Sequence, residues 1–174
     1  MQNLTPRAPP TVVILATGGT IAGRADDAAD NVGYRSASLG VAALLAAVPP
    51  LRALPLEAEQ LAQVDSKDMD FAVWQRLAQR AAFHLARSEV AGVVVTHGTD
   101  TLEETAYFLH RVLAPAKPLV LTAAMRPATS LQADGPQNLL DAVTRARTAG
   151  ARGVLAVAAG TVHGAPPQIG RAHV

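Results

Sequence analysis

Short apolar runs alternate along the chain with longer segments in which apolar and polar residues recur at helical spacing. The runs are rich in Val, Leu and Ala, and they cover residues 12–16, 61–64, 93–95, 119–122 and 154–158. A run that is apolar at nearly every position predicts a strand covered on both faces, as in a parallel sheet. The pattern therefore predicts a sheet whose strands are joined by helices.

The first two intervening segments carry signals for the start and end of helices. We expect Ser38 to cap a helix that stops at the prolines 49–50. Asp68 or Asp70 should open the next helix, whose apolar positions recur at helical spacing to residue 85.

Two more helices are predicted further along the chain. Asp100 precedes Glu103 by three residues, which is capping-box spacing and predicts a helix to about residue 113. Pro136 suits the first turn of a last helix, and Gly150 suits its end.

Strands and helices thus alternate in βαβα order. This order predicts an α/β fold with a doubly wound, mostly parallel sheet and helices on both faces, a Rossmann-like architecture. Residues 23–37 differ from the rest because they are polar and charged, and their apolar residues follow neither the helical nor the strand period. We expect them to form a mobile loop over a site.

Composition narrows the class of protein. The chain has 174 residues, 49% of them hydrophobic and 3% aromatic, a net charge of +1 and no cysteine. The balanced charge does not indicate binding to nucleic acid or to a membrane surface, and the absence of cysteine excludes thiol catalysis and zinc–thiolate sites.

Residues 1–10 are Pro-rich and expected to be flexible, and they lack the apolar stretch of a secretory signal. We expect a soluble, cytoplasmic protein with one domain over residues 11–165.

Candidate chemistry gathers in two loops that leave predicted strands. Thr17-Gly-Gly-Thr20 follows the first strand, and Thr96-His-Gly-Thr99-Asp100-Thr follows the third. Ligands of open α/β sheets bind at the carboxyl ends of the strands, where a hydroxyl can act as a nucleophile. The first loop has neither G-x-G-x-x-G spacing nor a Gly-Lys-Ser/Thr phosphate loop.

Each of these residues also has a purely structural interpretation. Thr17 stands in what could be simply a tight turn between a strand and a helix. Asp100 could cap the following helix, hold a substrate ammonium, or do both. His97 has no second histidine at metal-ligand spacing and is more typical of a packed or turn histidine.

Together the motifs resemble those of the bacterial L-asparaginase family, types I and II. The similar segments are residues 14–23, 96–106, 124–127 and 133–139, and the resemblance runs from about residue 11 to 165. It implies the fold of the family's N-terminal catalytic domain. It also implies hydrolysis of the side-chain amide of L-asparagine to L-aspartate and ammonia, with no cofactor and no metal, and L-glutamine as the alternative substrate.

The resemblance also implies roles for individual residues. Thr17 would be the nucleophile that forms an acyl-enzyme, and Tyr34 would support its hydroxyl from the loop at residues 23–37. Thr99 would be the second catalytic threonine and would contact substrate. Ser66 would bind the substrate α-carboxylate, and Asp100 would bind its ammonium group within the catalytic site.

The sequence departs from the family at two places. Lys67 stands where some relatives have Gln, which bears on the choice between asparagine and glutamine. The match ends near Ala165, before a family lysine that partners the second threonine and before a smaller C-terminal domain. Family members are homo-oligomers whose sites are shared between subunits.

We expect residues 166–174 to be a non-native tail. The last six residues match the translated start of a common short-read sequencing adapter, and a natural frameshift or a real short terminus are the alternatives. Two other functions stay open: a non-catalytic module that binds an amino acid, and the asparaginase-like subunit of a tRNA-dependent amidotransferase.

Overall fold

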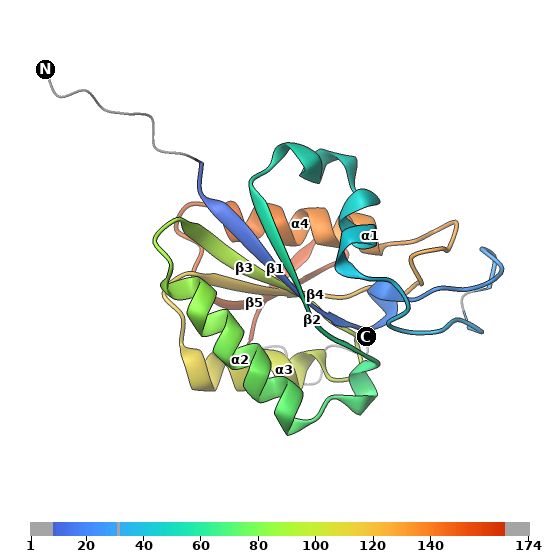
Figure 1. The fold of residues 1–174 in the computed structure, drawn as a ribbon, viewed down its shortest axis with the longest axis horizontal. Helices are drawn as coiled ribbons and strands as arrows, with labels where there is room; N and C mark the ends of the chain where they lie inside the picture. The colour runs from blue at the N-terminus through green and yellow to red at the C-terminus, as the bar shows by residue number, and fades with distance from the viewer. Residues whose placement is uncertain (1–8, 31, 166–174) are drawn as a thin grey trace, which may run out of the picture.

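The computed structural model describes residues 9–30 and 32–165, which form a sheet with helices on both faces (Figure 1). Most of the predicted flexible N-terminus and the whole predicted tail at residues 166–174 lie outside the described residues. The strands and helices follow in the order β1 (Thr11–Gly18), α1 (Val41–Ala46), β2 (Leu56–Val64), α2 (Phe71–Ala86), β3 (Val90–Thr96), α3 (Leu102–Leu113), β4 (Pro118–Thr122), α4 (Gly135–Arg147), β5 (Gly153–Ala158) and β6 (Thr161–Gly164). Short 3₁₀ turns are η1 (Thr20–Ala22), η2 (Pro49–Ala53) and η3 (Ser66–Asp68).

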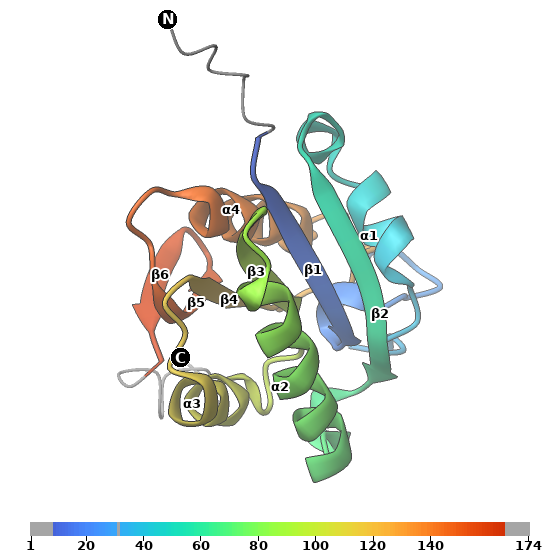
Figure 2. The same ribbon diagram turned by 60° about the vertical axis from the view of Figure 1, so that its left-hand side comes forward.

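The six strands lie in the order β2-β1-β3-β4-β5-β6 (Figure 2). The first five are parallel, and β6 pairs antiparallel with β5. The α/β class and the mostly parallel sheet predicted from the sequence are confirmed. Since parallel strands point the same way, the loops that follow β1, β2 and β3 leave the sheet at one edge.

Two apolar clusters hold the layers together, one on each face of the sheet. Val13 and Leu15 face α2 and α3, where they pack in one cluster with Leu77 and Leu109. Val12 and Ile14 point the other way and pack with α4 and α1, as the second cluster shows. All four β1 side chains are at most 1% exposed. Burial of a Val or Leu side chain contributes about 1.5–3 kcal/mol, so β1 anchors both layers.

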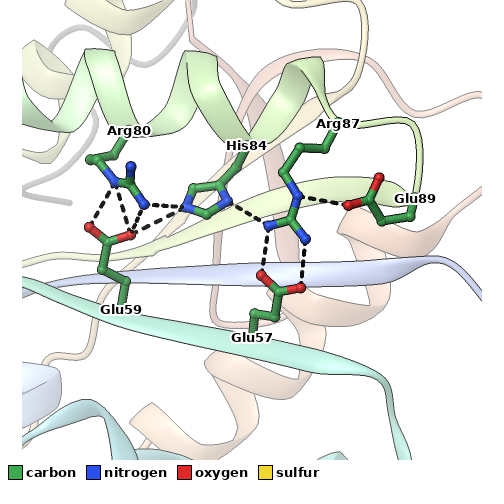
Figure 3. A network of polar contacts seen from close by, with 6 residues as sticks. All are labelled: Glu57, Glu59, Arg80, His84, Arg87 and Glu89. Carbon is green, nitrogen blue, oxygen red and sulfur yellow. Dashed lines mark hydrogen bonds and ion pairs between the residues drawn. The ribbon is translucent and has the colours of Figure 1, made fainter.

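Strand β2 begins five residues before the predicted run at 61–64 because acidic residues conceal it in the sequence. Two glutamates of β2, Glu57 and Glu59, face helix α2 (Figure 3). Arg80 and His84 of α2 and its C-cap residue Arg87 lie opposite them. Arg80 donates to Glu59 at 2.8 Å, and Arg87 donates to Glu57 at 2.7 Å. Hydrogen bonds from these guanidinium groups lower the pKa of both carboxyl groups. The edge strand is thus fastened to α2 by charge as well as by apolar packing.

His84 lies in the middle of this network and is buried. Its Nδ1 lies 3.1 Å from Nη1 of Arg87, which can only donate, so Nδ1 is the acceptor. Its Nε2 lies 3.2 Å from the Glu59 carboxylate and 3.2 Å from Nη2 of Arg80. The imidazole therefore links the two arginine–glutamate pairs.

The first two helix starts differ partly from expectation. Ser38 does not cap α1: its hydroxyl donates to Arg35 O, and Gly40 is the N-cap residue. Instead, the side-chain oxygen of Gln60 accepts a hydrogen bond from Val41 N, the first residue of α1, at 2.8 Å. Asp70 caps α2 by accepting from Val73 N, so Asp68 is not its cap.

The predicted capping box at Asp100 is wrong. Thr101 is the N-cap residue of α3, and no side chain caps it by a hydrogen bond. Asp100 lies before the helix, where its backbone N–H donates to Ser66 Oγ. The predicted proline in the first turn of α4 is confirmed, but α4 ends at Arg147 rather than at Gly150.

Strand β6 was not predicted because it has only four residues and two of them are polar. Ala159 and Gly160 join it to β5, with φ of 50° and 72°. Two consecutive residues with positive φ are typical of the tight turn that reverses a chain between antiparallel strands. The Ala159 N–H is held at 3.0 Å by the side-chain oxygen of Asn138.

Asn138 joins three parts of the fold from inside α4. It is 3% exposed, and besides accepting from Ala159 N it donates to Ala123 O at 2.9 Å. It therefore connects the loop after β4 to the turn after β5. Among the residues described, no helix combines the length and apolarity needed to cross a membrane.

We predict that N138A lowers the free energy of unfolding by about 1–3 kcal/mol, because it leaves the buried carbonyl of Ala123 without its partner and removes the hydrogen bond from Ala159 N. Urea denaturation measures this loss. The matched control is Q137A, which removes an exposed amide one residue away and should change stability by no more than about 0.5 kcal/mol. A loss for N138A as small as that of the control contradicts the prediction.

Candidate functional site

Three loops that leave neighbouring strands meet at the carboxyl edge of the sheet. Ala16 of β1 pairs with Thr96 of β3, and Gly18 pairs with Val64 of β2, so the three exits lie level. Gly19 lies against Gly98 so closely that a Cβ at position 19 would overlap the backbone of Gly98. The backbones of the two threonine loops therefore lie together at this edge.

Ser66 brings the third loop into this meeting point. A Cβ at Gly98 would overlap the Ser66 side chain, so only glycine fits there. Ser66 Oγ accepts from Asp100 N at 3.1 Å, and Ser66 O accepts from the Thr101 hydroxyl at 2.8 Å. These bonds hold Ser66 against Asp100 and Thr101, next to Thr99 in the chain, and the roles that the resemblance implies for these residues stay predictions. Ser66 is buried, Thr99 is half-buried and Asp100 is exposed.

Thr17 lies inside the sheet rather than at its edge. Thr17 belongs to β1 and is 2% exposed. Its hydroxyl donates a hydrogen bond to Thr96 O at 2.8 Å. The hydroxyl thus completes a hydrogen bond to the neighbouring strand.

Thr20 is the hydroxyl that meets Tyr34. Thr20 opens the 3₁₀ turn η1 directly after the glycine pair, and its Oγ1 lies 2.7 Å from the Tyr34 hydroxyl. The expectation that Tyr34 supports Thr17 is wrong, because the register of the tight turn carries Thr20, three residues later, to the tyrosine. Sequence reasoning missed Thr20, although the motif Thr-Gly-Gly-Thr places a second threonine directly beyond the two glycines.

Tyr34 is brought to Thr20 by a fixed path of the polar segment at residues 23–37. Arg24 and Arg35 exchange two backbone hydrogen bonds of 2.9 Å, which pair the two arms of the segment. A Cβ at Gly23 would lie 2.9 Å from the Tyr34 ring, so the glycine lets the ring pack onto the chain. The segment is therefore tied back beside the first strand, and its mobility stays a prediction.

The loop after β4 holds the same segment from the other side. Ala128 N donates to Gly23 O, and Ala25 N donates to the Thr129 hydroxyl at 2.9 Å. Asp134 anchors this loop by accepting from Met125 N and Arg126 N. The motifs around residues 124–127 and 133–139 thus support the tyrosine segment.

His97 supports the second threonine loop from beneath. Its Nδ1 lies 2.7 Å from Gly98 O, an acceptor, so Nδ1 carries the proton. Its Nε2 then accepts from the Thr105 hydroxyl at 3.0 Å, and Thr105 in turn accepts from Trp74 Nε1 at 2.8 Å. Burial lowers the pKa of His97 to about 4, partly opposed by the hydrogen bond to Gly98. The prediction of a packed turn histidine is confirmed.

In sequence, the chain matches the family profile described as "Asparaginase, N-terminal" over residues 11–167. The chain belongs to the asparaginase family. It is 44% identical over 145 residues to L-asparaginase 2 of Bacillus subtilis, covering 83% of this chain and 39% of that protein. It is 45% identical over 156 residues to L-asparaginase 2 of Escherichia coli, covering 88% and 44%.

The fold agrees with that of a solved asparaginase. The probable cytoplasmic L-asparaginase of Campylobacter jejuni superposes with a TM-score of 0.86 at 42% identity, over 90% of this chain and 48% of that one. Another relative is named a probable periplasmic L-asparaginase, from Haemophilus influenzae, with 43% identity. The chain thus spans less than half the length of these asparaginases, and the compartment stays a prediction.

Acid should destabilise the protein through His97. The unfolded chain protonates this histidine near pH 6.5, whereas the folded chain does so near pH 4, so the unfolded state binds more protons between them. Unfolding free energy should therefore fall by up to about 3 kcal/mol from this group as pH drops from 6.5 to 4.

Urea denaturation of the parent and of H97Q across this pH range measures the contribution as a difference of slopes. NMR titration of the His97 ring in the parent gives a second reading that needs no variant. Equal slopes, or a ring that titrates near pH 6.5, contradict the prediction.

Proposed function

We propose that this chain is the N-terminal part of an asparaginase that hydrolyses the side-chain amide of L-asparagine to L-aspartate and ammonia. The observation that carries the proposal is the 2.7 Å pair of Thr20 and Tyr34 hydroxyls at the loop junction that also holds Ser66, Thr99 and Asp100. The names and sequence identities of the relatives support the same reaction. Because the chain spans only part of their length, the whole protein's activity is inferred.

Within this reaction we assign the nucleophile to Thr20 instead of Thr17. A nucleophilic hydroxyl needs access to the amide carbon and a partner that can take or relay its proton. Thr17 is committed to the Thr96 carbonyl between two strands. Thr20 lies beyond the strand in a tight turn and meets a phenol, which can both donate and accept a proton.

The reaction then proceeds in two stages. Thr20 Oγ1 attacks the amide carbon as its proton passes to the Tyr34 oxygen, the Tyr34 hydroxyl hydrogen is delivered to the amide nitrogen, and the C–N bond breaks to release ammonia. Water next attacks the acyl-threonine and releases aspartate, with Thr99 as the neighbouring hydroxyl that contacts this water or the reacting carbonyl. Splitting amide cleavage into acylation and deacylation is the general advantage of a covalent nucleophile.

The backbone of the substrate amino acid would be held by Asp100 and Ser66. The exposed Asp100 carboxylate can pair with the α-ammonium group, and such charge-assisted bonds are about twice as strong as neutral ones. Ser66 Oγ already accepts from Asp100 N, so its own hydrogen can be donated to the α-carboxylate. We propose that the reaction needs neither a metal nor a cofactor. We also propose a cytoplasmic location.

We predict that an L-asparagine analogue with a diazomethyl ketone in place of the amide labels Thr20. Intact-mass measurement and peptide mapping locate the adduct. The matched isosteric variants are T20V and T17V, which each replace one hydroxyl by a methyl group. The adduct should disappear in T20V and persist in T17V. An adduct on Thr17, or labelling of T20V at another threonine of the two loops, contradicts the assignment of Thr20.

Taken by itself, this chain should turn over asparagine at less than about 1 per second, below the usual enzyme range, because it spans less than half the length of its asparaginase relatives. An ammonia-release assay measures this rate. D100N should lower kcat/KM by a further factor of about 10–100, because it removes the charge that holds the ammonium group. Binding of asparagine with no ammonia release would favour the amino-acid-binding module, and turnover at the ordinary rate would show that the missing part is dispensable.

A further inference from the structure

The polar segment at residues 23–37, which we call the tyrosine segment, carries Tyr34 to Thr20 but has little apolar packing to hold it there. Among the residues of this segment that the structure describes, those that are buried are Gly23, Ala25 and Ala37. Its valine, Val32, is 90% exposed. A segment with few buried apolar contacts opens readily. The position of Tyr34 therefore depends on the hydrogen bonds that join this segment to the rest of the fold.

Thr129, in the loop after β4, bonds both backbone polar groups of Ala25. Its Oγ1 accepts from Ala25 N at 2.9 Å and donates to Ala25 O at 3.3 Å. A hydroxyl has one hydrogen to donate and lone pairs with which to accept, so it can make both bonds at once. Because Ala25 is 5% exposed, its backbone groups are left without a good partner when this hydroxyl is removed. The side chain thus bonds Ala25 as a neighbouring strand would.

Ala25 is connected to Tyr34 through the pairing of the two arms of the segment. Arg24, which precedes Ala25, exchanges two backbone hydrogen bonds of 2.9 Å with Arg35. Tyr34 directly precedes Arg35, and its hydroxyl lies 2.7 Å from Thr20 Oγ1. A displacement of Ala25 therefore reaches Tyr34 across one pair of backbone bonds.

The loop after β4 gives Thr129 a fixed base (Figure 1). The Asp134 carboxylate accepts from Met125 N at 2.9 Å and from Arg126 N at 3.0 Å. It also accepts at 3.2 Å from Nδ2 of Asn138, which is buried in α4. The loop is thus held to α4 on one side and bonds the tyrosine segment on the other.

We propose that Thr129 is a positioning residue for the amide hydrolysis: its hydroxyl holds Ala25 and thereby keeps the Tyr34 hydroxyl at Thr20. Thr129 acts through the tyrosine segment and touches neither the substrate nor the reacting atoms. The proposal rests on the function proposed above, in which the Tyr34 oxygen takes the proton of Thr20. The groups assigned to the substrate ammonium and carboxylate stand on the loops after β2 and β3. Loss of the Thr129 hydroxyl should therefore slow acylation and leave substrate binding unchanged.

Fluorine NMR tests the position of Tyr34 without any need for activity. The chain has two tyrosines, so protein labelled with 3-fluorotyrosine gives two resonances, and the variant Y107F assigns them. In T129V, which exchanges the hydroxyl for a methyl group, the Tyr34 resonance should move towards its position in urea-unfolded protein. T129S keeps the hydroxyl and should keep the parent resonance. The matched control is T144V, which makes the same exchange on the exposed face of α4 and should also keep it.

Hydrogen exchange measures the same opening at the backbone. Amides of residues 24–30 and 32–35 should exchange about tenfold faster in T129V, a change that corresponds to about 1.4 kcal/mol and suits the loss of bonds to a buried residue. Exchange in β1 and β3 should stay at the parent rate. Faster exchange in those strands as well would show that Thr129 merely stabilises the fold, and it would overturn the proposal. Parent-like exchange and a parent-like Tyr34 resonance in T129V overturn it too, as does a T129S variant that behaves like T129V.

The diazomethyl ketone analogue connects this contact to the reaction. In T129V the maximal rate constant for labelling Thr20 should fall at least about tenfold, because a general acid–base partner contributes about 10²–10⁴-fold. The analogue concentration that gives half of this rate should not change, and T129S should restore the rate. A displaced Tyr34 with an unchanged labelling rate overturns the proposal. Absence of labelling in the parent counts against Thr20 as nucleophile, whereas the resonance and the exchange rates still decide whether Thr129 positions Tyr34.

Discussion

The contact between Gly19 and Gly98 is the constraint on which the site depends. Two backbones can lie this close only where neither residue has a side chain. The contact brings the exit of β1 onto the exit of β3, and the bonds of Ser66 add the loop from β2. A side chain at either glycine would separate the loops by about the width of a methyl group, and displacements of about 1 Å are enough to disable a catalytic arrangement.

The threonines near this junction divide into two groups by where their hydroxyls point. Thr17 and Thr122 use theirs to bond carbonyls inside the sheet, at 2.8 Å each. Thr20 and Thr99 lie beyond the strand ends, where Thr20 is 8% exposed and Thr99 is half-buried. The strand boundary thus separates the hydroxyls that bond within the sheet from those to which we assign chemical roles.

Much of the fold could be predicted because its central strands are apolar on both faces. The runs in β1, β3 and β4 gave the class and the edge where ligands bind. Only half of strand β2 was predicted, since Glu57 and Glu59 are polar in the sequence but pair with Arg80 and Arg87 of α2 and its end. Such pairing is long-range and leaves no local signal.

The candidate site was predicted as a region more successfully than as a set of roles. Both threonine loops and Ser66 were placed correctly beside one another. The exchange of Thr17 for Thr20 could not be seen, because it depends on how the turn after Gly18 winds and on where a distant tyrosine arrives. Asp100 was misread as a cap for a similar reason, since Ser66 occupies its N–H from another loop.

The chain has a single tryptophan, and its position has an optical consequence. The indole N–H of Trp74 bonds Thr105, Thr105 bonds His97, and His97 bonds the carbonyl of Gly98 in the second threonine loop. Each bond constrains the next, so a shift of the loop changes the hydrogen bonding of the indole. Intrinsic fluorescence of the half-exposed Trp74 ring is therefore expected to respond, without any label, to changes at the edge of the sheet where the three loops meet.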